Sequence, residues 1–319
     1  MRALRPRTGR GAGARGGLSG AVPPDSGVTN PVTQILFPAL VVVVMFALGT
    51  GLTTEDLRRV LSRPKALIVG SAAHAVGLPV LAFALALLFR PRPELAIGLV
   101  IIASCPANST SNLFTHLAGG DTMLSVCLTA ATSLLATLSI PYVVNLALAA
   151  FRPEGGAAVA LPVVGSALAI FLLTTLPVIA GMALRRARPA LAKEIEARMG
   201  AFGLIVIAVV VALAVWSEKD NVLPSLWAAG GLAIGLNVLA VAAAWGMSAL
   251  FGLPTGQRIA IGLECGLQNF AMAAFISMSL LGDIRLLAPA IAYGLTMWIS
   301  AGVVVFLSRR ARPRTAGVR

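Results

Sequence analysis

Long apolar runs separated by short polar connections fill the chain from about residue 31 to residue 307. A run of about 20 mostly apolar residues is long enough to cross a bilayer as an α-helix. Nine runs approach or exceed this length, and we expect each to form a transmembrane helix. In chain order they are Pro31 to Leu52, Lys65 to Phe89, Leu95 to Leu117, Met123 to Ala149, Ala157 to Leu184, Gly200 to Trp216, Val222 to Phe251, Ile259 to Leu281 and Leu286 to Leu307. The pattern therefore predicts an all-α polytopic membrane protein.

Two of the nine runs are interrupted in their interior. In the third, Pro106 is followed by the polar sequence NSTSN at residues 108–112, and the eighth contains GLECGLQN at residues 262–269. Proline lacks a backbone N–H, and small polar side chains compete with the helix for backbone hydrogen bonds. Non-helical backbone at membrane depth survives only where protein or a lined cavity satisfies it. We therefore expect two discontinuous helices that cross each other.

The order of the runs indicates an inverted repeat. The interrupted third and eighth runs are five helices apart, so they cross the membrane in opposite directions. The fourth run then corresponds to the ninth, the second to the seventh and the first to the sixth, while the fifth has no counterpart. An ancestral protein with two repeats of five helices, of which the first helix has been lost, would leave the fifth run without a counterpart.

Composition and charge agree with a membrane protein and add an orientation. Hydrophobic residues make up 58% of the chain and charged residues 12%, against roughly 25% charged residues in soluble domains. The net charge of +13 comes from Lys and Arg clusters between the apolar runs rather than from one basic surface, so no nucleic-acid partner is expected. The clusters are densest after the first and fifth runs and at the C-terminus. The positive-inside rule therefore places the C-terminus in the cytoplasm and, with nine helices, the N-terminus outside a plasma (inner) membrane.

The two ends of the chain are expected to lie outside the membrane domain. Residues 1–30 are rich in Gly and Arg and contain no apolar segment, so they do not resemble a secretory signal peptide. We interpret them as a disordered basic tail or as the product of a misassigned start. Residues 309–319 are interpreted as a basic cytoplasmic tail.

Glu264 stands out because it is an acid within the apolar eighth run. A charge at mid-membrane depth costs about 3 kcal/mol even on insertion scales, so it needs a cation, a proton or a water-filled cavity as its partner. An intramembrane enzyme would need a second acid, a nucleophile–base pair or a metal cluster, and the runs do not offer one. The three cysteines, Cys105, Cys127 and Cys265, form no CxxC and are expected to be buried thiols. The acid therefore predicts a functional site in a protein that is not an enzyme.

Three segments resemble the bile acid:sodium symporter family: MFALGTGLTTEDLRRVLSRPKALIVG at residues 45–70, SCPANSTSNLFTHLAGGDTMLSVCLTAATSLLA at 104–136, and GLECGLQN at 262–269. The resemblance extends from about Pro31 to Leu307. It implies a transporter membrane domain at residues 31–308, with a panel formed by about 31–52 and 157–216 and a core formed by about 65–149 and 222–307. It also implies two sodium ions bound beside an organic anion.

The resemblance implies a first sodium site at Ser111, Asn112, Ser125, Thr129 and Glu264. The residues themselves agree with it, because Ser125 and Thr129 are four positions apart and share a helix face. Hydroxyl, amide and carboxylate oxygens are the hard ligands that suit a cation such as Na⁺. Taken singly, the Ser and Thr residues could instead bond helix carbonyls, as is common in membrane helices.

A second sodium site is implied at Glu264, the carbonyls of Cys265 and Leu267, Gln268 and position 74. At position 74 the family commonly has a glutamine, and this chain has His74. Imidazole is a poor ligand for Na⁺ and titrates near physiological pH. Three interpretations follow: the second site binds sodium weakly, water completes it, or a proton replaces one sodium ion. A fourth is that His74 only forms a hydrogen bond between helices.

Substrate contacts are implied at Ser109, Thr110 and Asn269, where the N-termini of half-helices carry partial positive charge and favour an anion. The resulting hypothesis is a sodium-coupled symporter that imports an organic anion, bile-acid-like or a smaller carboxylate, by alternating access. Two alternatives stay open: an efflux carrier of the same broad fold, of the arsenite or auxin type, with a cysteine as soft-metal ligand, and a proton-coupled carrier that uses His74. The expected partners are the organic anion and the lipid bilayer, and the sequence leaves the oligomeric state open.

Overall fold

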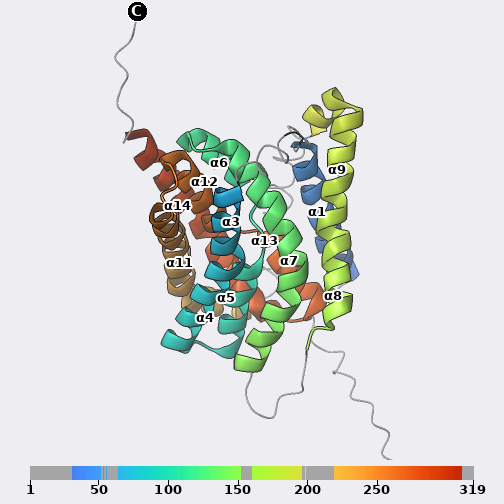
Figure 1. Ribbon diagram of the computed structural model, residues 1–319. Helices are drawn as coiled ribbons and strands as arrows, with labels where there is room; N and C mark the ends of the chain where they lie inside the picture. Colours follow the sequence, from blue (N-terminus) through green and yellow to red (C-terminus); the bar gives the residue numbers. More distant parts are fainter. Residues whose placement is uncertain are drawn as a thin grey trace, which may run out of the picture.

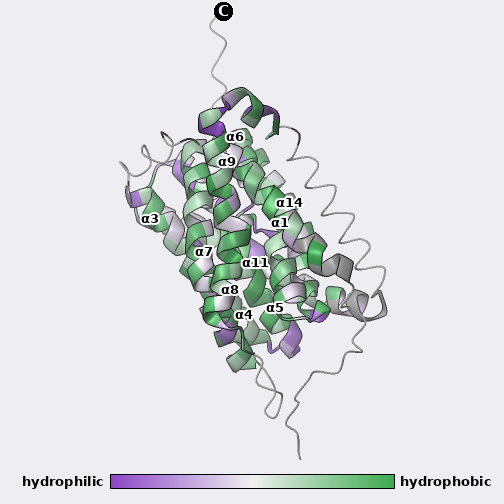
Figure 2. Ribbon diagram, turned by 90° about the vertical axis from the view of Figure 1, so that its right-hand side faces the viewer, coloured by the Kyte–Doolittle hydropathy of each residue, from purple (hydrophilic) through white to green (hydrophobic). Residues whose placement is uncertain are grey.

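A computed structural model describes residues 31–51, 53, 55, 64–108, 110–151, 160–195, 198 and 219–310. Within these ranges the regular elements are all helical, and they stand side by side in one bundle (Figure 1). Hydrophobic residues run along the helices, while hydrophilic ones gather at their ends (Figure 2). Five described helices are long and apolar enough to cross a membrane: Pro64–Phe89, Thr122–Phe151, Val163–Ala187, Leu226–Leu250 and Ile284–Arg310. The predicted class, an all-α polytopic membrane protein, is confirmed.

Prolines and breaks divide the chain into its helices. In chain order they are α1 (Pro31–Gly51), α3 (Pro64–Ala72), α4 (Leu78–Phe89), α5 (Pro93–Ser104), α6 (Thr110–Ala118), α7 (Thr122–Phe151), α8 (Val163–Ile170), α9 (Leu176–Ala187), α11 (Lys219–Leu250), α12 (Thr255–Gly266), α13 (Phe270–Ala274) and α14 (Ala288–Arg310). Short π-helical and 3-10 stretches continue several of them: η1 (Ala73–Gly77), η2 (Phe171–Thr175), η3 (Phe275–Leu280) and the 3-10 turn η4 (Ile284–Leu287). The π-helices η1 and η2 each end two residues before a proline, Pro79 or Pro177, whose missing N–H disturbs the normal helical bonding.

Most of the predicted transmembrane helices are found in these elements. The second, fourth, fifth, seventh and ninth correspond to the five spans above, and the first corresponds to α1. The sixth, Gly200 to Trp216, lies outside the described residues. The predicted start of the fifth, Ala157, also lies outside the described residues; within them, helix α8 begins at Val163 after the extended Pro162.

The third predicted helix is discontinuous, but its break is shorter than predicted. Helix α5 ends at Ser104, since Cys105 precedes Pro106 and adopts the extended conformation that proline imposes on its neighbour. Helix α6 resumes at Thr110. Ser111 therefore lies in the first turn of α6 and not in the break.

The break in the eighth predicted helix is shorter as well. Helix α12 continues through Glu264 and ends at Gly266. Asn269 then starts α13 as its N-cap, and its Oδ1 accepts a hydrogen bond from Met272 N at 3.1 Å. Glu264 is thus held by a regular helix, three residues before the irregular backbone begins.

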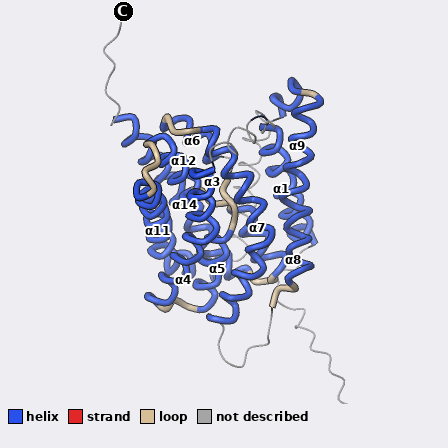
Figure 3. Tube along the Cα trace, in the orientation of Figure 1, coloured by secondary structure: helices blue, strands red, loops and turns tan. Residues whose placement is uncertain are grey.

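The two breaks meet inside the bundle, where Figure 3 shows non-helical backbone between the helices rather than at their ends. Two backbone hydrogen bonds of 2.9 Å join them, from Asn108 N to Leu267 O and from Asn269 N to Pro106 O. Each break supplies one donor and one acceptor, which is the pattern of the antiparallel bridge between Ala107 and Gln268. The breaks therefore satisfy part of each other's backbone at a depth where water cannot.

Helix α1 packs mainly on α9 at one edge of the bundle, where α8 also lies, and the other helices form the larger part (Figure 1). Within the larger part, α12 packs against α6, α7 and α11. Helix α1 also contacts α13 and η3, so the edge meets the larger part near the second break. The division into panel and core stays a prediction, and part of the predicted panel lies outside the described residues.

Gly49 and Gly181 let the backbones of α1 and α9 approach closely. A Cβ atom at Gly49 would collide with the carbonyl oxygen of Val178, and one at Gly181 would collide with that of Phe46. We expect Gly49→Ala and Gly181→Ala each to lower the unfolding temperature in detergent by several degrees, because such overpacking costs about 1–3 kcal/mol. Gly302→Ala on α14 is the matched control, since its Cβ meets no atom within 4 Å. Equal unfolding temperatures for Gly181→Ala and Gly302→Ala would contradict the close helix contact.

Candidate functional site

Glu264 is fully buried on α12, where this helix packs against α6 and α7. Its Oε2 accepts hydrogen bonds from Ser111 Oγ at 2.8 Å and from Ser125 Oγ at 3.4 Å. Its Oε1 is also buried and has no hydrogen-bond partner among the described residues. No Lys or Arg in the described part of the chain forms an ion pair with it. An ionised carboxylate at this position therefore lacks a compensating charge.

Oxygen atoms from α6 and α7 surround the same carboxylate. Asn112 Oδ1 accepts hydrogen bonds from Ser125 Oγ at 2.9 Å and from Thr129 Oγ1 at 3.5 Å. Thr129 Oγ1 also lies 3.5 Å from Ser111 Oγ. The structure thus brings together all five residues predicted for the first sodium site. We refer to Ser111, Asn112, Ser125, Thr129 and Glu264 as the Glu264 cluster.

Thr115 was not predicted, yet it lies beside the Glu264 cluster. It is fully buried on α6, and its Oγ1 donates to Ser125 Oγ at 3.3 Å. It follows Ser111 by four residues, and residues four apart share a helix face. This spacing in the sequence could have identified Thr115 as a neighbour of the site. Thr115 therefore helps to orient the hydroxyl of Ser125.

His74 lies in η1 and is bonded to the first break. Its Nε2 donates to the carbonyl oxygen of Cys105 at 2.9 Å, since a carbonyl can only accept. Its Nδ1 is buried without a hydrogen-bond partner in the described part, and the backbone of Glu264 lies beside the ring. The role of His74 as a sodium ligand stays a prediction.

The other residues of the second predicted sodium site lie at the end of α12. Gln268 Nε2 donates to Cys265 O at 3.0 Å, and Gln268 Oε1 is buried without a partner among the described residues. Cys265 O also accepts from Tyr293 OH at 3.3 Å, and Leu267 O accepts an N–H from the first break. Both predicted carbonyl ligands are therefore already hydrogen-bonded. Within the described residues no hydrogen bond links His74 to Gln268. The side chains of the second predicted sodium site are therefore not connected by hydrogen bonds, whereas those of the Glu264 cluster are.

Two of the three predicted substrate residues lie at the starts of half-helices. Thr110 is the first residue of α6, and its Oγ1 is buried without a partner in the described chain. Asn269 uses its Oδ1 to cap α13, which leaves its buried Nδ2 without a partner in the same part. Ser109 lies outside the described residues. Each break therefore presents at least one buried polar atom that no described residue satisfies.

Asn237 on α11 and Tyr293 on α14 also bind the second break, and neither was predicted. Gly266 O accepts from Asn237 Nδ2 at 2.8 Å and from Tyr293 OH at 3.1 Å. Asn237 is the only amide side chain in the seventh apolar run. That isolation is a usable signal, because a buried amide needs hydrogen-bond partners that an apolar run cannot supply.

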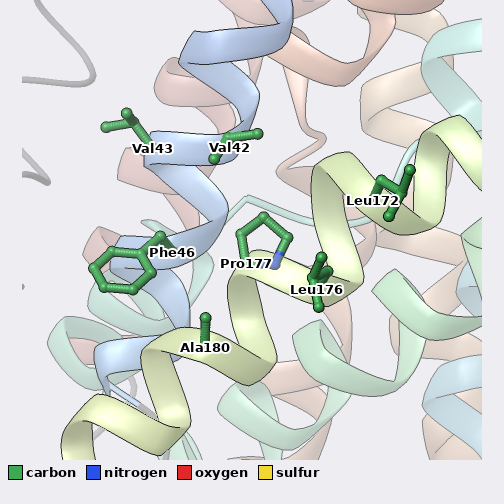
Figure 4. Close-up of a pocket in the computed structure, with 7 residues that line it drawn as sticks. All are labelled: Val42, Val43, Phe46, Leu172, Leu176, Pro177 and Ala180. Atoms are coloured by element: carbon green, nitrogen blue, oxygen red, sulfur yellow. The ribbon is translucent and has the colours of Figure 1, made fainter.

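The cysteine thiols and an apolar pocket beside α1 do not form part of this site. The three thiols are free and buried, as predicted, and no group of three His, Cys, Asp or Glu residues in the described part could hold a metal ion. A pocket of about 370 Å³ lies between α1 and the η2–α9 segment (Figure 4). It is lined by Val42, Val43, Phe46, Leu172, Leu176, Pro177 and Ala180. These side chains offer no polar group to a carboxylate, and no predicted site residue is among them.

Known proteins share most of the length of this chain. A model of the Sodium Bile acid symporter family matches residues 38–225. The uncharacterized sodium-dependent transporter YocS of Bacillus subtilis (strain 168) is 27% identical over 281 residues, which are 86% of this chain and 84% of YocS. The probable sodium/metabolite cotransporter BASS1, chloroplastic, of Arabidopsis thaliana is 26% identical over 272 residues, 85% of this chain and 66% of BASS1. The ileal sodium/bile acid cotransporter of Homo sapiens is 26% identical over 261 residues, 80% of this chain and 73% of that protein.

These three relatives carry the names of transporters and not of enzymes. This chain itself has five described helices that are long and apolar enough to cross a membrane. The family model covers more than half of the sequence, from residue 38 in α1 to residue 225 in α11. The chain therefore belongs to the Sodium Bile acid symporter family.

Proposed function

We propose that this protein is a sodium-coupled symporter that imports an organic anion by alternating access. The observation that carries the proposal is the Glu264 cluster, in which a buried carboxylate with one unpartnered oxygen meets side-chain oxygens from α6 and α7. The names of the relatives add support, because all three include sodium and two include a transported metabolite or bile acid.

One sodium ion fits the chemistry of the Glu264 cluster. A hard cation takes several oxygen ligands, and the cluster offers a carboxylate, an amide oxygen and three hydroxyls. These oxygens already lie between 2.8 and 3.5 Å from one another along the hydrogen bonds that join them. An ion among them would compensate the charge of Glu264, which otherwise costs about 3 kcal/mol at mid-membrane depth.

A second sodium ion is part of the proposal through the family resemblance. It would share Glu264 and use Gln268, whose Oε1 has no partner among the described residues, together with the carbonyls of Cys265 and Leu267. Cys265 O would first have to release one of the two hydrogen bonds that it accepts. His74 stands at the position of the family's glutamine, and its buried Nδ1 has no hydrogen-bond partner in the described part. Measuring the number of sodium ions moved per anion decides between one site and two.

The anion is proposed to bind at the two half-helix starts. Thr110 supplies a hydroxyl and Asn269 an amide N–H₂, both buried and without partners in the described chain, and Ser109 is the third proposed contact. The N-terminus of α6 adds partial positive charge. A carboxylate is the group that these donors would bind, whether on a bile-acid-like substrate or on a smaller acid.

Coupling follows from the placement of the sodium ligands. The Glu264 cluster spans α6, α7 and α12, so a bound ion would link both discontinuous helices and order the anion contacts beside them. An ion that binds one access state more tightly shifts the equilibrium toward it, and the anion must affect sodium binding by the same factor.

The basic ends of two helices support a cytoplasmic C-terminus. Arg185 and Arg186 lie in the last turn of α9, and Arg309 and Arg310 lie in the last turn of α14. Both helices end at the same face of the bundle (Figure 1). By the positive-inside rule we place this face in the cytoplasm of a plasma membrane.

Transport into reconstituted vesicles tests the proposal. Liposomes containing the purified protein would be supplied with a bile acid and a panel of smaller carboxylates under an inward sodium gradient, with an equal potassium gradient and protein-free liposomes as controls. We expect accumulation of an anion that requires sodium. Uptake at the same rate without sodium would contradict symport.

The same vesicles separate the two alternatives. Accumulation driven by an inward proton gradient in the absence of sodium would favour the proton-coupled carrier. Extrusion of arsenite or auxin that is lost when Cys105, Cys127 or Cys265 is replaced by alanine would favour the efflux carrier.

A further inference from the structure

The hydrogen bonds between the two breaks relate them residue by residue. Asn108 N bonds Leu267 O, and Asn269 N bonds Pro106 O, so each break presents the same donor and acceptor to the other. This reciprocal pattern makes Pro106 equivalent to Leu267 and Asn108 equivalent to Asn269. Cys105 immediately precedes Pro106, and Gly266 immediately precedes Leu267, so these two residues are equivalent as well.

The carbonyls of these two residues are both bound by buried side chains. Cys105 O, at the end of α5, accepts from His74 Nε2 at 2.9 Å. Gly266 O, at the end of α12, accepts from Asn237 Nδ2 at 2.8 Å. The last carbonyls of a helix have no partner within it, and inside a membrane they cannot turn to bulk water. Each half-helix is therefore ended by a side-chain donor from a neighbouring helix.

The two donors also occupy corresponding places in the repeats. His74 lies on the second predicted transmembrane helix and Asn237 on the seventh, and these two helices are partners in the inverted repeat. Their exposed fractions are 2% and 1%. Neither side chain is hydrogen-bonded to a side chain of the Glu264 cluster. We infer that His74 and Asn237 are a matched pair of positioning residues, one for each break.

This inference rests on the proposed sodium site and gives His74 a role that does not depend on its charge or on ion binding. Cys105 fixes the backbone that leads into α6, where Ser111 lies, and Gly266 is two residues beyond Glu264. Without His74, Cys105 O loses its side-chain donor, and without Asn237, Gly266 O keeps only the longer bond from Tyr293 OH at 3.1 Å. In either case the end of the half-helix is held less firmly. Sodium affinity should then fall in an Asn237 variant, although no proposed ion ligand has been removed.

The test measures the sodium concentration that gives half of the maximal thermal stabilisation in detergent, with choline chloride keeping the ionic strength constant. We expect His74→Leu and Asn237→Leu each to raise this half-saturation concentration by about fivefold, the factor that corresponds to one neutral hydrogen bond. His74→Gln should restore the wild-type value and leave the Hill coefficient unchanged, because the glutamine N–H₂ can reach the place of Nε2. The matched control is Asn145→Leu, which removes a side chain that bonds Leu161 N and O at 2.7 and 2.9 Å, away from the breaks.

The sodium half-saturation and the unfolding temperature of these variants separate a positioning role from general stability and from ion binding. Asn145→Leu should lower the unfolding temperature without moving the sodium half-saturation, which separates positioning from general stability. A wild-type half-saturation in either leucine variant overturns the inference, and so does a changed Hill coefficient in His74→Gln, which would make His74 an ion ligand. If His74→Leu does not fold, Asn237→Leu decides alone, because no proposed sodium site contains Asn237. A wild-type protein that sodium does not stabilise would instead refute the proposed function itself.

Discussion

We expect Glu264→Gln to abolish the effect of sodium on both transport and thermal stability. The substitution keeps the size of the side chain and removes the charge that compensates the cation. Wild-type protein should gain about 2.7 kcal/mol of stability when sodium is at a hundred times its dissociation constant. The variant should gain none, while its unfolding temperature in sodium-free buffer should equal or exceed that of the wild type. The reason is that an unpaired buried carboxylate, with one oxygen unpartnered in the described chain, is no longer present.

Thermal unfolding in detergent with sodium, potassium or choline chloride measures both parts of this expectation. Glu94→Gln is the matched control, because Glu94 lies in the first turn of α5, outside the proposed sites. It should retain the stabilisation by sodium. A Glu264→Gln protein that sodium still stabilises as it does the wild type would contradict the assignment of Glu264 as the anionic ligand.

Thr129→Val should raise the sodium concentration for half-maximal transport by about ten- to a hundredfold, while Thr129→Ser should remain close to wild type. Valine matches threonine in shape and lacks the oxygen that lies 3.5 Å from both Asn112 Oδ1 and Ser111 Oγ. A hydrogen bond to a charged group is worth about 1.5–3 kcal/mol, and each 1.4 kcal/mol changes an equilibrium constant about tenfold. The maximal rate at saturating sodium should change less, because Glu264 and the other ligands remain.

Thr174→Val provides the comparison for this variant. Thr174 is fully buried in η2, and its hydroxyl donates to Ile170 O at 2.7 Å, the ordinary role of threonine in a membrane helix. Its loss should not change the sodium requirement. Similar sodium half-saturation in Thr129→Val and Thr174→Val would mean that Thr129 serves only to bond its own helix, through Ser125 O at 3.0 Å.

The sequence was sufficient for those parts of the site that depend on local chemistry. Glu264 is conspicuous because a charge in an apolar run is costly, and Ser125 and Thr129 are related by the helical repeat. The family resemblance then joined these residues to Ser111 and Asn112 across long stretches of chain, and the structure places all five together. Whether they bind sodium stays a prediction.

Other parts of the site were missed or misplaced for identifiable reasons. The breaks were predicted to be longer than they are, because polar and glycine residues tolerated at a helix end look the same in a sequence as residues beyond it. Asn237 and Tyr293 were missed because a single polar residue in an apolar run gives no indication of which backbone group it bonds. For His74 the sequence allowed a hydrogen bond between helices but did not identify Cys105 O as the partner.

By itself, the sequence determined the membrane class, the main spans and the location of the two interruptions, because hydropathy, proline and helix capping act within one segment of chain. Only the tertiary structure decided how the two interruptions meet. The bonds from Asn108 to Leu267 and from Asn269 to Pro106 join residues that are far apart in sequence, and their geometry depends on how α5, α6, α12 and α13 pack. The same packing determines which oxygen of Glu264 is bonded and which is left without a partner in the described chain, and so where a cation would be needed.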